Sequence, residues 1–394
     1  IIKKKSRVEN CFHNVLCLSK AKGMDIKMKK KILFMLSNMN IGGTEKAFLN
    51  MLSFMSKDEF DVTILLLEKK GGFLKYLPDW VDVKVLKEYK EIEPLIMDSP
   101  QSLIKRFLKG KKILQAFQIA AYHLKFKILG DRSSYYKYVQ RECIIKNSYD
   151  VAIAYSGPMD FISIFILDRV QAKEKIQWIH FDVSKFYFNH KLAQNNYLRF
   201  DKVIVVSTKA AEELIKIIPN IREKVEVVPN LISSEMCYEY AKEFEAYPQK
   251  TNKIILTVGR LTEEKGQEII PDIVQILLNN GYENFKWYVV GDGKERENIE
   301  KKIIEQNIDE YIEMIGVTEN PYPYYKDADI YVQTSLHEGF CITLAEAKVF
   351  QLPIITTDVA GAYEQILSEK DGYIVERSAE KMARQIERVL EMMK

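Results

Sequence analysis

Cysteine is scarce in this chain, and its copies are scattered. The five cysteines are Cys11, Cys17, Cys143, Cys237 and Cys341, and no two of them form a Cys-x-x-Cys pair. Disulfide frameworks and structural zinc sites need paired, closely spaced cysteines, so the sequence argues against both. We expect free thiols, as in a protein of the reducing cytoplasm.

The sequence also lacks long apolar runs and a strong net charge. No apolar run reaches the ~18 residues of a membrane-spanning helix, and we find no secretory signal. The net charge is +3, which gives little reason to expect nucleic acid as a partner. With 47% hydrophobic and 29% charged residues, the composition is that of an ordinary globular protein. At roughly 150 residues per domain, a chain of 394 residues makes two or three domains.

The first 30 residues differ from the rest of the chain. Residues 1–30 are basic, polar and poorly periodic. We expect a disordered leader there, or sequence translated upstream of a true start at Met24.

Strand patterns alternate with helical patterns from residue 31 onward. The apolar run at residues 32–36 is typical of a strand buried on both faces, whereas the alternation at 81–86 predicts an edge strand. Expected strands are 32–36, 62–67, 81–86, 151–155, 175–179 and 203–206, then 253–258, 285–290, 311–315, 330–332, 353–356 and 372–375. This order predicts an α/β protein with parallel sheets that helices cover on both sides.

Two doubly wound, Rossmann-like domains that face each other across a cleft are the expected architecture. The first spans residues 31–230 and includes a basic helical segment at 101–148. Residues 231–252 are polar and either helical or irregular, and are interpreted as the linker. The second domain spans residues 253–376, and residues 377–394 form an amphipathic helix that we expect to pack back toward the first domain.

The most informative stretch is residues 335–347, which hold two carboxylates. Glu338 follows a predicted buried strand in a Gly-containing loop, and Glu346 lies on the predicted helix after that loop. Loops at the carboxyl ends of parallel strands bind ligands. A carboxylate that accepts from a hydroxyl makes a charge-assisted hydrogen bond. The stretch is therefore suited to a polyhydroxylated ligand such as a sugar nucleotide.

Several motifs together resemble one known family. They are Val258-Gly-Arg-Leu-Thr-Glu-Glu-Lys-Gly266, Val290-Gly-Asp-Gly293, Ile315-Gly316, the segment from Glu338 to Glu346, and, in the first half, Gly42-Gly-Thr-Glu45 and Trp178-Ile-His-Phe-Asp182. In order and spacing they resemble the retaining glycosyltransferases of family 4 (glycosyl transferases group 1), which have the GT-B fold. The resemblance runs from about residue 31 to the C-terminus. It implies that the first domain holds the acceptor and the second holds a nucleotide-sugar donor.

The resemblance implies that Arg260 and Lys265 hold the diphosphate of the donor. Preplaced cations stabilise the negative charge that develops on a leaving phosphate. Arg can bind two oxygens at once, and Lys acts as a compact point charge. The alternative is a solvated basic pair at a helix start, where positive charge is mildly unfavourable.

The resemblance also implies that Glu338 contacts the donor sugar and Glu346 the ribose. Backbone N–H groups at the start of the following helix would bind sugar and phosphate, so Cys341, where many relatives have Pro, should be harmless. The alternative is a surface loop followed by a solvated helical Glu. The implied donor-binding residues are Gly42, Gly43, Gly259, Arg260, Lys265, Gly316, Val317, Glu338, Gly339, Phe340, Cys341, Ile342, Thr343, Leu344 and Glu346.

The implied catalytic residues are His180, Arg260, Lys265 and Glu338. His180 follows a predicted strand, and by resemblance it lies near the reacting sugar, with Asp182 as a candidate to orient it. The alternative is a packed structural histidine. Gly42 and Gly43 permit close backbone approach to a ligand, or they form an ordinary turn.

Other tempting signals are rejected. The segment 291–296 begins like a dinucleotide fingerprint but lacks the third Gly. Asp327-Ala-Asp329 imitates a metal-binding Asp-x-Asp but joins a helix to a strand, and His337 has no partner at metal-ligand spacing. We therefore expect no metal and no cofactor.

The segment 101–148 is strongly basic, with apolar and aromatic residues at helical spacing. Such a helix can lie on an anionic membrane surface, or its apolar face can pack on its own domain. Nucleic acid is a weaker third option.

The sequence thus predicts a retaining, metal-independent hexosyltransferase that uses a nucleoside diphosphate sugar, by family frequency a UDP-sugar. The expected acceptor is a hydroxyl of a saccharide or lipid-linked saccharide in bacterial capsule or cell-surface polysaccharide synthesis. The expected location is the cytoplasm, peripheral on the inner face of the plasma membrane if 101–148 binds lipid. The alternatives are a UDP-sugar epimerase of the same fold and a non-catalytic nucleotide-sugar-binding subunit that anchors a partner at the membrane.

Overall fold

The structure is a computed structural model that describes residues 29–157, 160–181, 183–184, 189–248, 250 and 252–393. Nearly all of the predicted leader, and Asp182, lie outside these ranges. The chain divides into two compact units, Ile1–Pro229 and Asn230–Lys394. No helix in the described ranges is both long enough and apolar enough to cross a membrane.

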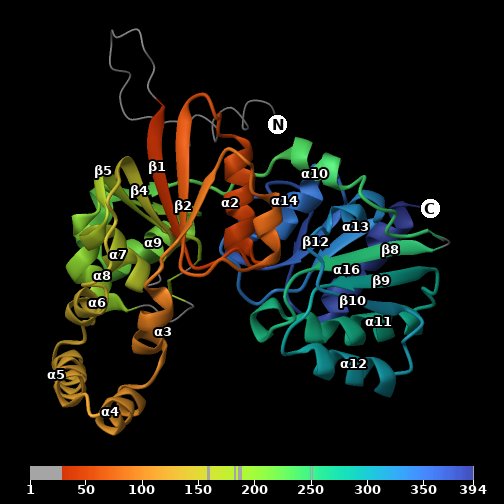
Figure 1. The fold of residues 1–394 in the computed structure, drawn as a ribbon. Helices are drawn as coiled ribbons and strands as arrows, with labels where there is room; N and C mark the ends of the chain where they lie inside the picture. The colour runs from red at the N-terminus through yellow and green to blue at the C-terminus, as the bar shows by residue number, and fades with distance from the viewer. Residues whose placement is uncertain are drawn as a thin grey trace. The chain divides into compact units, whose positions relative to one another are not determined.

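The first unit is built on a parallel sheet of seven strands in the order β3-β2-β1-β4-β5-β6-β7 (Figure 1). Residues 32–36 at the end of β1 are buried on both faces of the sheet, which explains their unbroken apolar run. The strands are β1 (Lys30–Leu36), β2 (Phe60–Leu66), β3 (Asp82–Val85), β4 (Ser148–Gly157), β5 (Gln171–Ile179), β6 (Lys202–Val205) and β7 (Val225–Val227).

Helices cover both faces of this sheet. Phe48 of α2 packs on one face, with its ring centroid 5.1 Å from those of both Phe34 and Tyr155. Helices α3, α6, α7 and α9 contribute to the core on the other face. The helices are α2 (Gly43–Ser53), η1 (Gly72–Tyr76), α3 (Tyr89–Met97), α4 (Pro100–Lys109), α5 (Ile113–Leu129), α6 (Ser133–Val139), α7 (Asp160–Arg169), α8 (His190–Asn196), η2 (Tyr197–Arg199), α9 (Thr208–Ile217) and η3 (Pro219–Lys224).

The second unit has a parallel sheet of six strands in the order β10-β9-β8-β11-β12-β13. Its strands are β8 (Lys253–Val258), β9 (Phe285–Val290), β10 (Ile312–Gly316), β11 (Ile330–Gln333), β12 (Ile354–Thr357) and β13 (Tyr373–Val375). Its helices are α10 (Ser234–Tyr240), η4 (Glu263–Lys265), η5 (Gln267–Ile269), α11 (Ile270–Asn279), α12 (Arg296–Glu305), α13 (Tyr322–Asp327), α14 (Ile342–Val349), α15 (Ala360–Tyr363) and α16 (Ala379–Met392).

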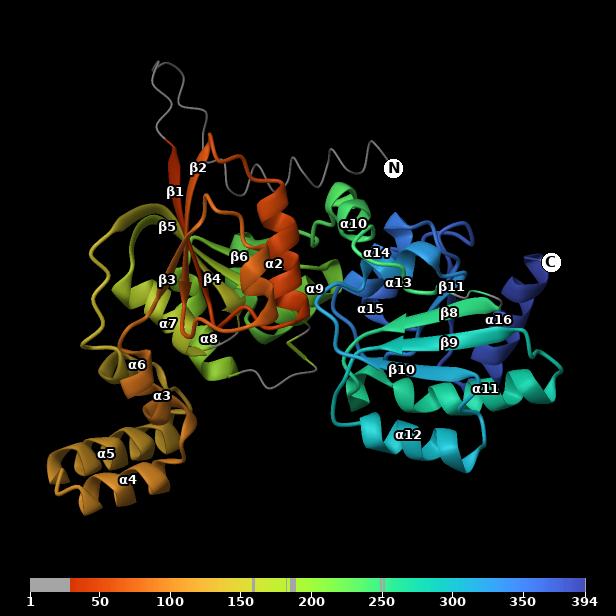
Figure 2. The same cartoon turned by 45° about the vertical axis from the view of Figure 1, so that its right-hand side comes forward.

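The two faces of the second sheet have separate cores. Every second residue of a strand faces the same side of the sheet. Ile255 of β8 and Trp287 of β9 pack with α11, α12 and α16 on one face. Their neighbours Leu256 and Tyr331 pack with α10, α13 and α14 on the other. Figure 2 shows α11 and α12 together on one side of the strands. Every strand expected from the sequence is present, with ends that differ by a few residues, and β3 lies at an edge as predicted.

Two segments pack into the cores of the second unit. The segment predicted as a polar linker contains α10, whose Cys237 is fully buried in the core of the second unit, because Cys237 and Ala241 form one apolar face. The last helix, α16, was expected to pack toward the first domain. Its apolar residues, including Met382 and Ile386, are buried against α11 within the second unit, and its packing toward the first domain stays a prediction.

Each sheet reverses its strand order beside its first strand. The reversal lies between β1 and β4 in the first unit and between β8 and β11 in the second. At such a point the loops after the two neighbouring strands leave in opposite directions and open a crevice, which is where doubly wound sheets bind ligands.

Candidate functional site

The candidate site of the second unit consists of the loops that follow β8 and β11. The two strands are neighbours in the sheet, so their carboxyl ends lie side by side. The amides of Leu336 and His337 donate to the carbonyl oxygen of Glu264 at 2.9 and 3.3 Å. The hydroxyl of Thr334 donates to the carbonyl oxygen of Lys265 at 3.1 Å. These hydrogen bonds hold the two loops together, although they are about 70 residues apart in sequence.

Gly266 allows this close approach. Its backbone is left-handed (φ +65°), and a Cβ there would lie 2.5 Å from the carbonyl oxygen of Thr334. The guanidinium of Arg377 spans the same contact, because it donates to the carbonyl oxygens of Thr334 at 3.1 Å and Gly266 at 3.2 Å. It also pairs with Glu268. Arg377 was not among the residues predicted from the sequence, and the available signal was its place just after the last strand.

Lys265 and Glu338 form an ion pair across the two loops. The Nζ of Lys265 lies 2.6 Å from Oε1 of Glu338, and the Ser335 hydroxyl donates to the same oxygen at 2.8 Å. The side chains are 24% and 11% exposed, so the pair is largely shielded from solvent. A Lys ammonium has three donors. It can therefore keep Glu338 and still bind an anionic oxygen.

Arg260 lies at the open edge of the same site. Its side chain is 67% exposed, and its Nη2 lies 3.7 Å from the carboxylate of Glu264. Partial burial alone would raise the pKa of Glu264. A hydrogen bond from its own backbone amide, with the charges of Arg260 and Lys265, outweighs this effect and lowers the pKa. Glu264 therefore stays ionised and can pair with Arg260.

The loops after β9 and β10 complete this edge of the sheet. Gly291 has a φ of +144°, and a Cβ there would lie 1.9 Å from the carbonyl oxygen of Gly259. The Gly291 amide donates to the carbonyl oxygen of Gly316 at 2.8 Å. Val317, the next residue, is exposed. The structure thus brings Gly259, Gly316 and Val317 to the same edge as Arg260.

Helix α14 begins where the Glu338 loop ends. Cys341 precedes it in a left-handed conformation, and no described side chain caps the helix start. The side-chain amide of Gln333 donates to the Cys341 sulfur at 3.4 Å, and the side-chain amide of Gln365 donates to the Cys341 carbonyl oxygen at 3.3 Å. Burial, and the nearby charge of Glu338, raise the pKa of the Cys341 thiol well above its usual value. Cys341 is therefore a packed thiol that shapes the loop.

The first turn of α14 consists of the predicted residues Ile342, Thr343 and Leu344, after Gly339 and Phe340 in the loop. The Thr343 hydroxyl lies within 3.4 Å of Oε1 of Gln333 in β11. This contact sets the start of the helix against the strand that leads into the loop.

Glu346 occupies a different environment from the one expected. Its side chain is fully buried, and its Oε1 accepts a hydrogen bond from the hydroxyl of Tyr322 at 3.2 Å. Burial, then the charge of Glu346, raises the pKa of Tyr322, so this hydroxyl keeps its proton. In this geometry the carboxylate is covered, and Tyr322 occupies one of its oxygens.

The predicted residues of the first unit lie at the ends of its strands. Gly42 is the N-cap of α2, and Gly43 begins the helix and is exposed. The ring of His180, directly after β5, lies parallel to that of Trp178 at 5.9 Å and 4.4 Å from that of Tyr155. Burial and the charge of Glu45 in α2 raise the pKa of Tyr155 well above its usual value. Tyr155 thus connects helix α2 with His180, and it was not among the residues predicted from the sequence.

The C-terminal part of the chain matches a described family. Residues 240–394 match the model of the family Glycosyl transferases group 1.

Within the described residues, no group of three potential metal ligands is arranged to hold an ion.

Curated relatives match different shares of the chain. An uncharacterized glycosyltransferase of Haemophilus influenzae is 23% identical over 361 residues, which is 89% of this chain and 87% of that protein. The amylovoran biosynthesis glycosyltransferase AmsD of Erwinia amylovora is 31% identical over 132 residues, 34% of this chain and 36% of that protein. The match thus spans only about a third of the Erwinia relative.

Solved structures share the fold of this chain. The crystal structure of Anabaena HepE in complex with UDP and glucose superposes with a TM-score of 0.67 at 17% identity, over 92% of this chain and 90% of that chain. At this identity the similarity concerns the fold.

Proposed function

We propose that this chain, a protein of the GT-B fold whose residues 240–394 form a glycosyl transferases group 1 domain, is a glycosyltransferase that moves a hexosyl unit from a nucleoside diphosphate sugar to a hydroxyl acceptor. UDP is the nucleotide that we propose, because the Anabaena structure of this fold was solved with UDP and glucose.

The pairing of Lys265 with Glu338 is the observation that carries the proposal. It puts a cation and a carboxylate, 2.6 Å apart, at the strand-order reversal of the second sheet. A sugar nucleotide presents both chemistries at once, a diphosphate that a cation binds and hydroxyls that a carboxylate binds. The exposed Arg260 beside them adds a second cation that can bind two phosphate oxygens.

Each residue then has a proposed role. Arg260 and Lys265 stabilise the charge that develops on the departing diphosphate. Glu338 binds the donor sugar, and the N–H groups at the start of α14 bind sugar and phosphate. Glu346 binds the ribose. Gly42, Gly43 and His180 are the residues of the first unit that we propose take part in the reaction.

The proposed reaction proceeds with retention at the anomeric carbon. The bond between that carbon and the leaving phosphate oxygen breaks, and the acceptor oxygen bonds to the same face of the carbon. The phosphate oxygen takes the acceptor's proton, so no protein group needs to gain or lose one. Protein catalysis is then positioning and charge stabilisation, and Arg260 and Lys265 do the work that a metal ion does in other transferases.

The proposed acceptor is a saccharide or lipid-linked saccharide of a bacterial capsule or cell-surface polysaccharide. The amylovoran biosynthesis enzyme of Erwinia is the relative that supports this choice. The acceptor must supply a hydroxyl, and the first domain must select it.

The test is a screen of the purified full chain with a panel of UDP-sugars, with and without a pool of saccharide and lipid-linked acceptors. We expect UDP release that depends on an acceptor. Conversion of a UDP-sugar without any acceptor would identify an epimerase instead. UDP binding without release or transfer would identify a non-catalytic subunit. If the chain bound no nucleoside diphosphate at all, the proposal would be wrong.

A further inference from the structure

Helix α5 has a row of large apolar side chains that the protein does not bury. Ile113, Phe117, Leu124 and Ile128 are 70%, 70%, 59% and 72% exposed. Their spacing of four, seven and four residues places them on one face of a helix with 3.6 residues per turn. The exposed Ala121 lies in the same row. We call Ile113, Phe117, Ala121, Leu124 and Ile128 the α5 stripe.

The opposite face of α5 already makes the contacts that hold the helix to its unit. Ala116 and Ile119 are buried there. The ring of Tyr122 lies 5.0 Å from that of Tyr138, and the Tyr138 hydroxyl donates to Gln118 at 2.8 Å. The α5 stripe is therefore not needed for the fold of the first unit. Figures 1 and 2 both show α4 and α5 as a hairpin, with α6 and α3 between it and the sheet.

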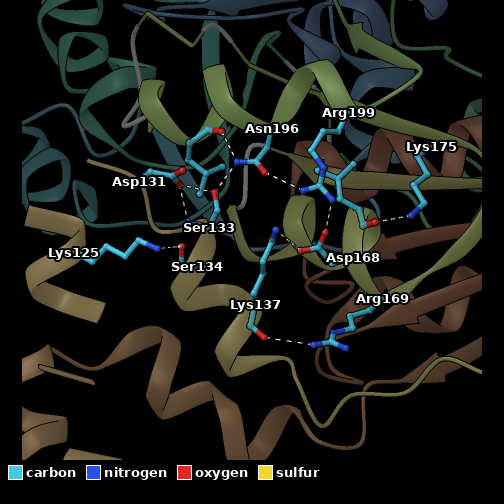
Figure 3. Close-up of polar contacts among 12 residues, drawn as sticks. Lys125, Asp131, Ser133, Ser134, Lys137, Asp168, Arg169, Lys175, Asn196 and Arg199 are labelled. Atoms are coloured by element: carbon cyan, nitrogen blue, oxygen red, sulfur yellow. Dashed lines mark hydrogen bonds and ion pairs between the residues drawn. The ribbon is translucent and has the colours of Figure 1, made fainter. Parts of the chain in front are cut away.

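Polar contacts fix the base of this hairpin (Figure 3). The Lys125 ammonium donates to the Ser134 hydroxyl at 2.8 Å. Asp131 accepts from the Ser133 amide at 2.8 Å and from the side chain of Asn195, in α8, at 2.7 Å. Asn196 donates to the Ser133 hydroxyl at 2.6 Å. These contacts tie the end of α5 and the start of α6 to α8.

The charge around the α5 stripe has one sign. Between Asp98 and Asp131 the sequence contains no acidic residue, and its cations are Lys105, Arg106, Lys109, Lys111, Lys112, Lys125 and Lys127. Arg106 pairs with Asp98. The lysines are exposed. A second copy of this hairpin would bring two surfaces of the same charge together, which repulsion opposes. An anionic partner has the complementary charge.

We infer that the α5 stripe and its lysines form a docking surface for an anionic lipid bilayer. Apolar side chains on one face of a helix enter the boundary between head groups and acyl chains, and flanking lysines pair with anionic head groups. The inference concerns a surface and its partner, and it stands whether or not the chain transfers sugars.

The experiment is flotation of the full chain with vesicles of phosphatidylglycerol and phosphatidylethanolamine, compared with phosphatidylcholine vesicles. We expect binding to the anionic vesicles that weakens between 0.1 and 0.5 M salt, since screening shortens the range of charge attraction. Phe117→Ser with Ile128→Ser should lower partitioning by about 25- to 100-fold, at roughly five- to tenfold for each side chain that no longer enters the bilayer. Lys112→Glu with Lys127→Glu should lower it by about the same factor, at about fivefold for each basic charge removed.

Matched controls change similar side chains away from the hairpin. Ile304 is 70% exposed on α12, so Ile304→Ser removes an equally exposed apolar side chain. Lys301→Glu with Lys370→Glu reverses two exposed lysines of the second unit. Both controls should bind as the unchanged chain does. Circular dichroism and melting temperatures would show that all variants remain folded.

Several results would overturn the inference. The unchanged chain could fail to bind anionic vesicles, or the stripe variant could bind as well as the Ile304→Ser control. Sedimentation velocity could show a dimer that the stripe variant abolishes, and the occupant would then be a second copy. The last contrary result is an acidic protein that binds the chain only when the α5 stripe is intact, while vesicles neither displace it nor are displaced by it. The partner of the stripe would then be a protein instead.

Discussion

At the scale of single residues, Lys265 has two tasks in the proposed site. Its ammonium lies 2.6 Å from Glu338, and its backbone carbonyl oxygen accepts from Thr334. Only the first task depends on the side chain. A substitution of Lys265 therefore removes the charge and leaves the backbone contact between the two loops.

We predict that Lys265→Met lowers kcat for sugar transfer by about 10²–10³-fold, which is typical when one preplaced group that stabilises transition-state charge is removed. Steady-state kinetics with the donor found in the screen would measure it. Lys302→Met is the control, because Lys302 forms a comparable half-buried pair with Asp272 at 3.2 Å away from the site. Equal activity in the two variants would contradict the role of Lys265.

Glu346 and Tyr322 allow the proposed ribose contact to be separated from packing. Glu346→Gln keeps the shape of the side chain but removes its charge, and we predict that it raises the donor KM about 10-fold or more, the value of a charge-assisted hydrogen bond. Tyr322→Phe removes the hydroxyl that lies 3.2 Å from Oε1 of Glu346. It should lower the free energy of unfolding by about 1 kcal/mol and leave the donor KM unchanged.

These two outcomes are measured by donor kinetics and by urea unfolding of both variants. A ribose contact requires that only Glu346→Gln change the donor KM. If both variants lowered stability alike and neither changed the KM, Glu346 would be a structural residue of the α13–α14 core.

At the scale of elements, the 3-10 turn η4 and the loop after β11 behave as one piece. Gly266 is the residue that permits it, because a Cβ there would lie 2.5 Å from the Thr334 carbonyl oxygen. Gly281, after α11, also has a positive φ (+83°), but a Cβ there would meet nothing within 4 Å. Substitutions at the two glycines therefore distinguish the effect of backbone strain, which both positions share, from the effect of the clash between elements, which occurs only at Gly266.

We predict that Gly281→Ala costs about 1–2 kcal/mol of stability, the price of a left-handed non-glycine residue, with little loss of activity. Gly266→Ala should cost more, because the clash adds to the same strain, and it should also lower kcat by displacing Lys265 from Glu338. Thermal unfolding and transfer kinetics of both variants measure this. Full activity in Gly266→Ala would mean that the loop contact does not set the site.

At the scale of the whole molecule, the free energy of unfolding of the first unit should depend on pH. Asp160 begins α7. Burial raises its pKa from 3.8 to about 6, although Arg132 and Asn189 act in the opposite direction. The folded state thus holds this proton more tightly than the unfolded chain does. The resulting stabilisation is complete below about pH 4 and is lost as the pH rises through 6.

We predict that Asp160→Asn removes this part of the pH dependence. The unchanged chain should lose on the order of 1–3 kcal/mol between pH 4 and pH 7 through this group, and the variant should lose less over the same range. Urea unfolding at several pH values measures both curves. Parallel curves for the two proteins would show that Asp160 titrates normally in the folded state.

Much of the fold and part of the site could be predicted from the sequence. The apolar run of β1 and the loops that follow β8 and β11 were located correctly, because local periodicity and glycine-containing turns report on neighbours in the chain. The burial of Cys237 and Glu346 was not foreseen. Each depends on side chains that come from distant segments, such as Tyr322, and a single sequence does not reveal those pairings.

The sequence by itself determined which segments are strands and helices and which motifs follow the strands, since these follow from the spacing of apolar residues along the chain. Tertiary structure alone decided the strand order that makes β8 and β11 neighbours, and with it the meeting of Lys265 and Glu338. It also decided which face of α5 is buried and which is open. The reason is physical: a residue's place in an element depends on its near neighbours, but its contacts depend on how distant elements pack.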